Sequence, residues 1–182
     1  MACAIGSVML PRQTLFTDER IGDALMPTLE RLPVGSGVVF RHKRLGSTAR
    51  AALAQEVAAI CTRRALILSV SEDVALARTV GATYVHKPTS DPGAFPFSLP
   101  VHDSSEAVHA RRRGAAIAYI SPIFPTSSHL GGRALGVEKA HDLARICGCP
   151  AIALGGMDRA RFEAFDTGLF VGWAGIDAFL RA

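Results

Sequence analysis

The stretch covering residues 119–136 holds the densest set of side chains that could do chemistry. Its apolar run meets two prolines and gives way to hydroxyl side chains, a histidine and three glycines, including Thr126, Ser128 and His129. Because a proline interrupts a β-ladder, we expect these residues at the carboxyl end of a strand, where parallel sheets bind ligands. Hydroxyls, an imidazole and glycine N–H groups suit a phosphate-sized anion. A flexible polar surface loop remains the alternative.

A cluster of cations follows an earlier apolar run, in the sequence Arg41-His42-Lys43-Arg44. Since alternate residues of a strand share a face, Arg41 and Lys43 are predicted to point the same way. The arginine fork matches phosphate oxygens and lysine adds a point charge, so the pair would neutralise a diphosphate. The alternative is that these cations only make the surface soluble.

Asp91 and His102 follow the fourth and fifth apolar runs. Asp91 is the one carboxylate well placed for a Mg²⁺ ion that keeps most of its waters, although a Ser-Asp-Pro sequence also favours a plain Asx turn. His102 is either structural or, like His129, a candidate for moving a proton.

Glycines mark the ends of the last two apolar runs, at Gly155-Gly156 and at Ala174-Gly175. Glycines let backbone N–H groups approach a ligand, and the loops after strands seven and eight of a barrel are a habitual phosphate site. A short helix starting near Ile176 would add its dipole. The alternative is that the glycines only form tight turns.

These positions depend on a regular alternation of β-rich runs and segments of helical period. The predicted strands cover residues 14–17, 37–42, 65–70, 83–86, 97–102, 117–123, 151–154 and 169–173. The predicted helices cover residues 21–31, 47–63, 71–80, 104–113, 137–147, 158–165 and 176–181. Residues 87–96 carry three prolines and are predicted to form a loop without a full helix. Eight such units predict a compact (β/α)₈ TIM barrel. The rival is an open doubly wound sheet, and the chain lacks the GxGxxG turn that this fold has after its first strand.

Composition supports one α/β domain spanning residues 1–182, with 49% hydrophobic residues and a net charge of +4. The basic residues form no long stripe with interleaved aromatics, so we expect no nucleic-acid partner. No apolar stretch reaches about 18 residues, so we expect no membrane partner. Four cysteines without metal spacing favour a reduced, cytoplasmic protein, and homo-oligomerisation stays open.

The order of these motifs resembles the thiamine phosphate synthase family, which includes the related thiazole tautomerases. The resemblance covers nearly the whole chain, and its most specific part is SPIFPT at residues 121–126, followed by ALG at residues 134–136. It implies a (β/α)₈ barrel that couples a hydroxymethylpyrimidine diphosphate to a thiazole phosphate, with Mg²⁺ and release of pyrophosphate. Phosphorylated pyrimidine and thiazole molecules would be the partners.

The resemblance also implies roles for individual residues. Pyrophosphate would be held by the cations and hydroxyls Arg41, Lys43, Thr126 and Ser128. The metal would be bound by Asp91. The thiazole phosphate would lie against Gly156 and Ala174-Gly175, beside Gly155.

Several positions depart from the family pattern. The glutamine before the arginine is Val39, the Asn-Asp pair after strand three is read at Ser69-Val70, a serine is Pro100, and a lysine is His129. Pro122 stands where the tautomerases have a catalytic histidine. Two alternatives to the synthase therefore remain: a metal-free proton-transfer enzyme of the tautomerase type, and a non-catalytic module that binds a phosphorylated ligand.

Overall fold

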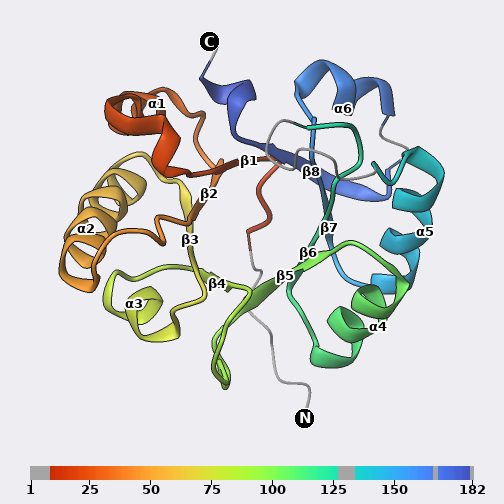
Figure 1. Cartoon of the computed structure of the whole chain (residues 1–182), viewed down its shortest axis with the longest axis horizontal. Helices are drawn as coiled ribbons and strands as arrows, with labels where there is room; N and C mark the ends of the chain where they lie inside the picture. The colour runs from red at the N-terminus through yellow and green to blue at the C-terminus, as the bar shows by residue number, and fades with distance from the viewer. Residues whose placement is uncertain (1–8, 127–133, 166–167, 181–182) are drawn as a thin grey trace.

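Eight short parallel strands pair in sequence order, and the last strand pairs back to the first, which closes a barrel (Figure 1). The computed structural model describes residues 9–126, 134–165 and 168–180. Its strands are β1 (Gln13–Phe16), β2 (Gly37–Phe40), β3 (Ile67–Ser71), β4 (Tyr84–His86), β5 (Phe97–Val101), β6 (Ile117–Ile120), β7 (Ala151–Leu154) and β8 (Phe170–Gly175). The predicted (β/α)₈ barrel is confirmed, and the open-sheet alternative is wrong.

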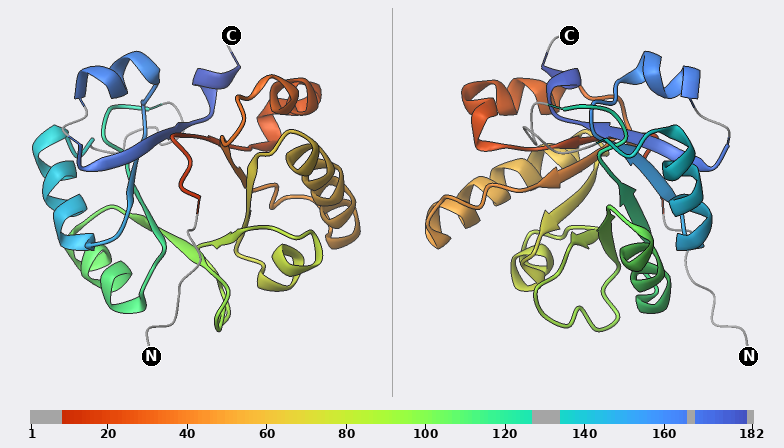
Figure 2. Two further views of the ribbon diagram at one scale, coloured as in Figure 1. Left: turned by 180° about the vertical axis from the view of Figure 1, so that it is seen from behind. Right: turned by 45° about the vertical axis from the view of Figure 1, so that its right-hand side comes forward.

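Helices cover the outside of the barrel, as the two further views also show (Figure 2). They are η1 (Glu19–Ala24), α1 (Leu25–Arg31), α2 (Ser47–Arg63), α3 (Val74–Thr79), α4 (Ser104–Arg113), α5 (Val137–Cys147), α6 (Arg159–Phe165) and η3 (Asp177–Phe179). No helix lies between β4 and β5, as predicted for residues 87–96. None of the helices in the described ranges is long and apolar enough to cross a membrane.

Three helices differ from the sequence prediction. The helix expected over residues 71–80 begins only at Val74, because β3 extends to Ser71. The helix expected over residues 21–31 is divided into η1 and α1, because Gly22 adopts a φ of 54°, which no α-helix contains. The helix expected over residues 176–181 is only the three-residue 3₁₀ turn η3, and its first residue is the acidic Asp177. A turn this short carries little dipole, so it adds little attraction for an anion.

The apolar core has two layers, because each strand is buried on both faces. The barrel interior contains Phe16, Val39, Ile67, Tyr84, Ile117, Tyr119, Ile152 and Ala174. The second layer lies between the strands and the helices, and it includes Val70, which is fully buried there. Val70 therefore faces the helix layer and no metal site.

A polar pair is buried inside the barrel near this interior layer. The Nδ1 atom of His86 lies 3.0 Å from Ser98 Oγ, and the His86 ring packs edge-on against Phe16 and Tyr119. Burial lowers the pKa of His86 to about 3, with Arg41 adding to the effect. The ring is therefore neutral at physiological pH and belongs to the structural core.

Candidate functional site

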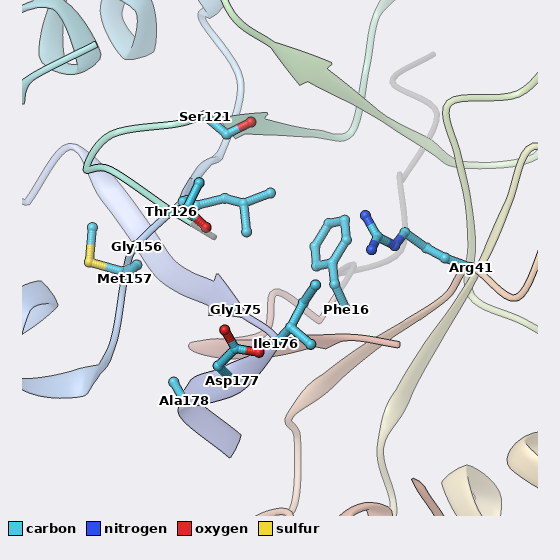
Figure 3. Close-up of a pocket in the computed structure, with 12 residues that line it drawn as sticks. Phe16, Arg41, Ser121, Thr126, Gly156, Met157, Gly175, Ile176, Asp177 and Ala178 are labelled. Carbon is cyan, nitrogen blue, oxygen red and sulfur yellow. The ribbon is translucent and has the colours of Figure 1, made fainter. Parts of the chain in front are cut away.

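A cavity opens at the carboxyl ends of β7 and β8, and we call it the β7–β8 cavity (Figure 3). It is lined by Phe16, Arg41, Ser121, Thr126, Leu154, Gly155, Gly156, Met157, Gly175, Ile176, Asp177 and Ala178. Its volume is about 100 Å³. This is smaller than the roughly 300–1,000 Å³ of pockets for drug-sized ligands, so it suits a small group or one end of a ligand.

Gly155 and Gly156 bring their backbone against the loop that follows β6. Their φ angles are 92° and 60°, a region that favours glycine. A Cβ atom on Gly155 would lie 2.5 Å from the Pro122 Cα atom, and one on Gly156 would lie 2.5 Å from the Pro125 carbonyl oxygen. Close packing thus requires glycine at both positions. The main chain of these two glycines therefore forms part of the cavity wall.

The predicted phosphate-binding residues divide into two groups. Gly155, Gly156, Gly175 and Thr126 all line the β7–β8 cavity, so Thr126 lies with the glycines and not with Lys43, with which the resemblance had grouped it. Ala174 does not line this cavity, because it is fully buried in the interior layer of the barrel. Alternation along β8 explains this result, since Ala174 and Gly175 lie on opposite faces of the strand.

Arg41 forms one wall of the cavity and is fixed by neighbours from β1. Its Nε atom donates to the Thr17 carbonyl at 3.1 Å, and its Nη2 atom donates to Asp18 Oδ2 at 3.0 Å. The guanidinium also lies over the Phe16 ring, 5.5 Å from the centroid. The pKa of Asp18 is lowered, first by the hydrogen bond from Arg20 and with a smaller contribution from Arg41, so this carboxylate is charged.

Sequence reasoning missed two polar side chains of this cavity, Ser121 and Asp177. Asp177 follows the β8 glycine by two residues, and in Figure 3 its carboxylate is turned toward the space that the labelled residues surround. The spacing from Gly175 was the available signal, but the prediction used it for a helix dipole. The dipole argument is wrong here, because η3 is short and begins with a negative charge.

A second cavity lies beyond the ends of β2, β3 and β4, and we call it the β2–β4 cavity. It is lined by Lys43, Arg50, Glu72, Asp73, Val74, Ala75, Thr89 and Ser90, with a volume of about 360 Å³. The Lys43 ammonium forms an ion pair with Glu72. Arg50 donates to the His42 carbonyl at 2.9 Å, to the Ser71 carbonyl at 2.8 Å and to Asp73 at 3.2 Å. Arg50 therefore holds the ends of β2 and β3 together.

Two of the three non-glycine residues with positive φ in the described ranges lie beside this second cavity. Glu72 and Lys87, which directly follow β3 and β4, have φ angles of 71° and 50°. Positive φ is uncommon for residues other than glycine, and such strain gathers at functional sites. The Glu72 carbonyl accepts two hydrogen bonds from Thr89, at 3.1 Å from its N–H and 3.2 Å from its hydroxyl. These bonds fix the loop after β4 against the end of β3.

Arg41 and Lys43 do not share one cavity, which corrects the prediction that they point together. Strand β2 ends at Phe40, so the alternation of a strand no longer applies at residues 41–43. Arg41 lines the β7–β8 cavity, whereas Lys43 lines the β2–β4 cavity. The two cations thus stand at the edges of two adjacent hollows.

Asp91 forms the Asx turn that the sequence analysis named as the alternative. Its Oδ1 atom accepts from the Gly93 N–H at 2.9 Å, and the side chain is exposed. It borders a separate shallow hollow with Thr89 and Ser90, the same two residues that line the β2–β4 cavity. The Glu72 carbonyl binds Thr89 and Asp91 follows Ser90 in the sequence, so Glu72 and Asp91 flank Thr89-Ser90.

Within the described ranges, no group of three or more histidine, cysteine, aspartate or glutamate side chains could hold a metal ion. His102 contributes to neither cavity, since its Nδ1 atom and its backbone N–H both lie 2.7 Å from Glu106 on α4, and the side chain is exposed. It stabilises the start of α4. Ser128 and His129 lie outside the described residues, and their predicted roles stay predictions.

Comparison with known proteins gives a consistent result. A family model described as thiamine monophosphate synthase matches residues 97–179. The chain is 30% identical over 187 residues to a putative thiamine-phosphate synthase 2 of Aquifex aeolicus, covering 94% of this chain and 99% of that protein. It is 29% identical over 161 residues to a thiamine-phosphate synthase of Listeria monocytogenes, covering 79% and 75% of the two chains.

A solved structure supports the same fold. Thiamine phosphate pyrophosphorylase from Pyrococcus furiosus matches with a TM-score of 0.79 and 21% sequence identity, covering 94% of this chain and 88% of that chain. Three findings agree: the fold, the family match over residues 97–179, and the near full-length similarity to the Aquifex protein. This chain belongs to the thiamine monophosphate synthase family.

Proposed function

We propose that this protein is a transferase of thiamine biosynthesis that joins a hydroxymethylpyrimidine diphosphate to a thiazole, with release of pyrophosphate. In the reaction that the family resemblance implies, the thiazole enters as its phosphate. The supporting observation is the pair of adjacent cavities at one rim of the barrel, joined by residues 41–43. The Cα atoms of residues 41 and 43 are at most about 7 Å apart, so one short segment of chain borders both cavities.

The bond changes define what the protein must supply. The bond between the pyrimidine CH₂ group and the diphosphate oxygen breaks, and its electron pair leaves with pyrophosphate. The lone pair of the thiazole nitrogen forms the new bond to CH₂, and the ring becomes a thiazolium cation. No enzyme nucleophile is needed, so positioning of the two molecules and stabilisation of the leaving charge provide the catalysis.

The β2–β4 cavity is the proposed pyrophosphate site. Lys43 faces Glu72 in the free protein, and it would exchange this carboxylate for a phosphate oxygen when the pyrimidine diphosphate binds. Arg41, at the edge nearer the β7–β8 cavity, would contact the oxygen where negative charge develops. Because Asp18 and the Thr17 carbonyl already orient the guanidinium, little conformational freedom is lost in this contact.

Magnesium fits this site only when the diphosphate supplies most of its ligands. The lack of a three-residue metal cluster among the described residues argues against a preformed protein cage. Magnesium usually keeps its waters and takes one or two carboxylates plus substrate phosphates. Glu72, once released by Lys43, and Asp91 are the residues that would hold it. The bound ion would neutralise charge on the leaving pyrophosphate.

The β7–β8 cavity is the proposed thiazole site. Its main-chain wall at Gly155 and Gly156 and its apolar side chains Phe16 and Ile176 would hold a flat ring against the barrel rim. Thr126 and Ser121 add hydroxyls that can bond polar atoms of the ligand. These groups would fix the ring so that its nitrogen faces the pyrimidine CH₂ group, and the effective concentration gained accelerates the coupling.

A coupling assay tests the proposal directly. The protein is incubated with Mg²⁺, a hydroxymethylpyrimidine diphosphate and either thiazole phosphate or the thiazole alcohol, and pyrophosphate and the thiazolium product are both quantified. We expect equal amounts of the two products and none when either substrate is omitted. Pyrophosphate without thiazolium product would indicate simple hydrolysis. Absence of both products with both thiazoles, from protein that is folded by circular dichroism, would contradict the proposed function.

A further inference from the structure

Asp177 places a carboxylate in the wall of the proposed thiazole site. It is the first residue of η3, and it lines the β7–β8 cavity together with Gly175, Ile176 and Ala178 (Figure 3). The side chain is half-buried, so solvent screens its charge only in part. A phosphate dianion in this cavity would meet a like charge at short range.

The cations that the structure describes near the cavity are already balanced by acids. Arg41 is the one cation among the described lining residues, and Asp18 binds it at 3.0 Å. Arg20 binds the same Asp18 carboxylate at 2.8 Å, and it also interacts electrostatically with Asp177. Two arginines and two aspartates therefore form one group with no net charge.

Arg161 is another described cation beside this wall. It donates to the Gly156 carbonyl, and its guanidinium lies 4.0 Å from Asp158. Its charge is thus also opposed by an acid, and its side chain is 54% exposed. The described residues consequently give the cavity little surplus positive charge to pair with a dianionic phosphate.

We infer that Asp177 selects a thiazole whose side arm ends in an uncharged hydroxyl in preference to the thiazole phosphate. This inference rests on the proposed function, which supplies the thiazole as the ligand of this cavity. A hydroxyl donates a hydrogen bond to a carboxylate, and such charge-assisted bonds are stronger than neutral ones. A phosphate dianion can only accept, so Asp177 offers it repulsion and no bond. Asp177 is therefore a specificity-determining residue.

The test compares the affinities of two ligands in three proteins by isothermal titration calorimetry without the pyrimidine diphosphate. The ligands are the thiazole alcohol and its phosphate, and the proteins are the parent, Asp177→Asn and Asp142→Asn. Asp142 is a matched control, since it lies on α5 with a side chain that is 69% exposed. We expect the parent to bind the alcohol more tightly, and Asp177→Asn to shift the affinity ratio toward the phosphate by about tenfold.

Each outcome decides the inference. The inference is overturned if the parent protein prefers the thiazole phosphate, or if Asp177→Asn leaves the affinity ratio unchanged. In that case, coupling of the thiazole phosphate at full rate would still support the proposed function. Equal shifts in Asp177→Asn and Asp142→Asn would show a general charge effect and also overturn it. Failure of both ligands to bind contradicts the thiazole site itself. Asp177→Ser, which also removes the charge, checks that the result does not depend on one folded variant.

Discussion

Arg41 and Asp18 form an ion pair between the ends of β2 and β1, with 3.0 Å between Nη2 and Oδ2. A second bond, from Arg41 Nε to the Thr17 carbonyl, fixes the plane of the guanidinium. An arginine has five N–H donors, and these two bonds use two of them. The remaining donors can face an anion at the cavity edge without any change of rotamer.

Arg41→Ala should therefore lower the rate of coupling far more than it lowers the affinity for the thiazole. Loss of one preorganised contact to developing negative charge typically reduces kcat by about 10²–10³. Arg41→Lys should recover only part of the rate, since lysine cannot form the two oriented bonds. Steady-state kinetics with each substrate varied would measure this, with Arg145→Ala on exposed α5 as the control. If Arg41→Ala raised KM and left kcat unchanged, Arg41 would have a role in binding alone.

The barrel was predictable from the sequence because its signals are local. Each strand is a short apolar run, and some of the following helices begin at a capping residue, as where Asp73 accepts from the Leu76 N–H at 2.8 Å and Asp103 from the Glu106 N–H at 2.9 Å. The Gly-Gly sequence of residues 155–156 was also readable, since close approach of main chain demands it. Placement at the carboxyl rim then followed from the fold.

The residues that the prediction misplaced depend on where elements end. Had β2 continued to residue 42, Arg41 and Lys43 would share a face, but it ends at Phe40. Glu72 was missed because its importance arises from pairing with Lys43, which is distant in sequence. Asp177 was missed because the sequence predicted a helix starting near Ile176, and this pattern does not show that Asp177 lines the cavity. Such facts come from tertiary contacts, which local patterns do not encode.

Gly156→Ala should be more damaging than alanine at another glycine of similar φ. The φ angles of Gly156 and Gly81 are 60° and 65°, but only Gly156 has an atom within 4 Å of the position of an added Cβ. Gly81→Ala should thus cost about 1 kcal/mol of unfolding free energy from strain alone. Gly156→Ala should cost about 1–3 kcal/mol more through the contact with the Pro125 carbonyl, and it should weaken thiazole binding. Urea unfolding and calorimetric titration of both variants would measure this, and equal costs would refute the steric argument.

His86 should make the protein less stable as the pH falls below about 6.5. Its ordinary pKa is near 6.5, and burial lowers the pKa in the fold to about 3. Between these pH values the imidazole is protonated in the unfolded chain and neutral in the folded chain. The free energy of unfolding therefore falls by about 1.4 kcal/mol for each pH unit of acidification. His86→Gln should show a shallower slope of unfolding free energy between pH 6 and pH 4, while His109→Gln, at an exposed site on α4, controls for loss of an imidazole. Parallel slopes for the parent and His86→Gln would contradict this prediction.

Asp91→Asn should raise the Mg²⁺ concentration needed for coupling while leaving the fold intact. The Asn side chain keeps an oxygen that can accept from the Gly93 N–H, so the Asx turn at 2.9 Å is preserved and only the charge is lost. Glu72→Gln should act in the same direction, because Glu72 and Asp91 flank Thr89-Ser90. Each single variant keeps one of the two proposed carboxylate ligands. Because diphosphate oxygens would supply most of the ligands, magnesium should still bind, but with lower affinity.

The measurement is the Mg²⁺ dependence of the initial coupling rate at saturating substrates, with unfolding midpoints recorded in parallel. Glu163→Gln is a matched control, since Glu163 pairs with Arg159 on exposed α6. We expect both site variants to need about tenfold more Mg²⁺, a loss of roughly 1.4 kcal/mol in binding, and the control to follow the parent. The double variant Glu72→Gln with Asp91→Asn should lose more than either single change, since each single change leaves one of the two proposed carboxylates in place. If the double variant keeps the Mg²⁺ dependence of the parent, the metal is held by the substrate alone and neither carboxylate is a ligand.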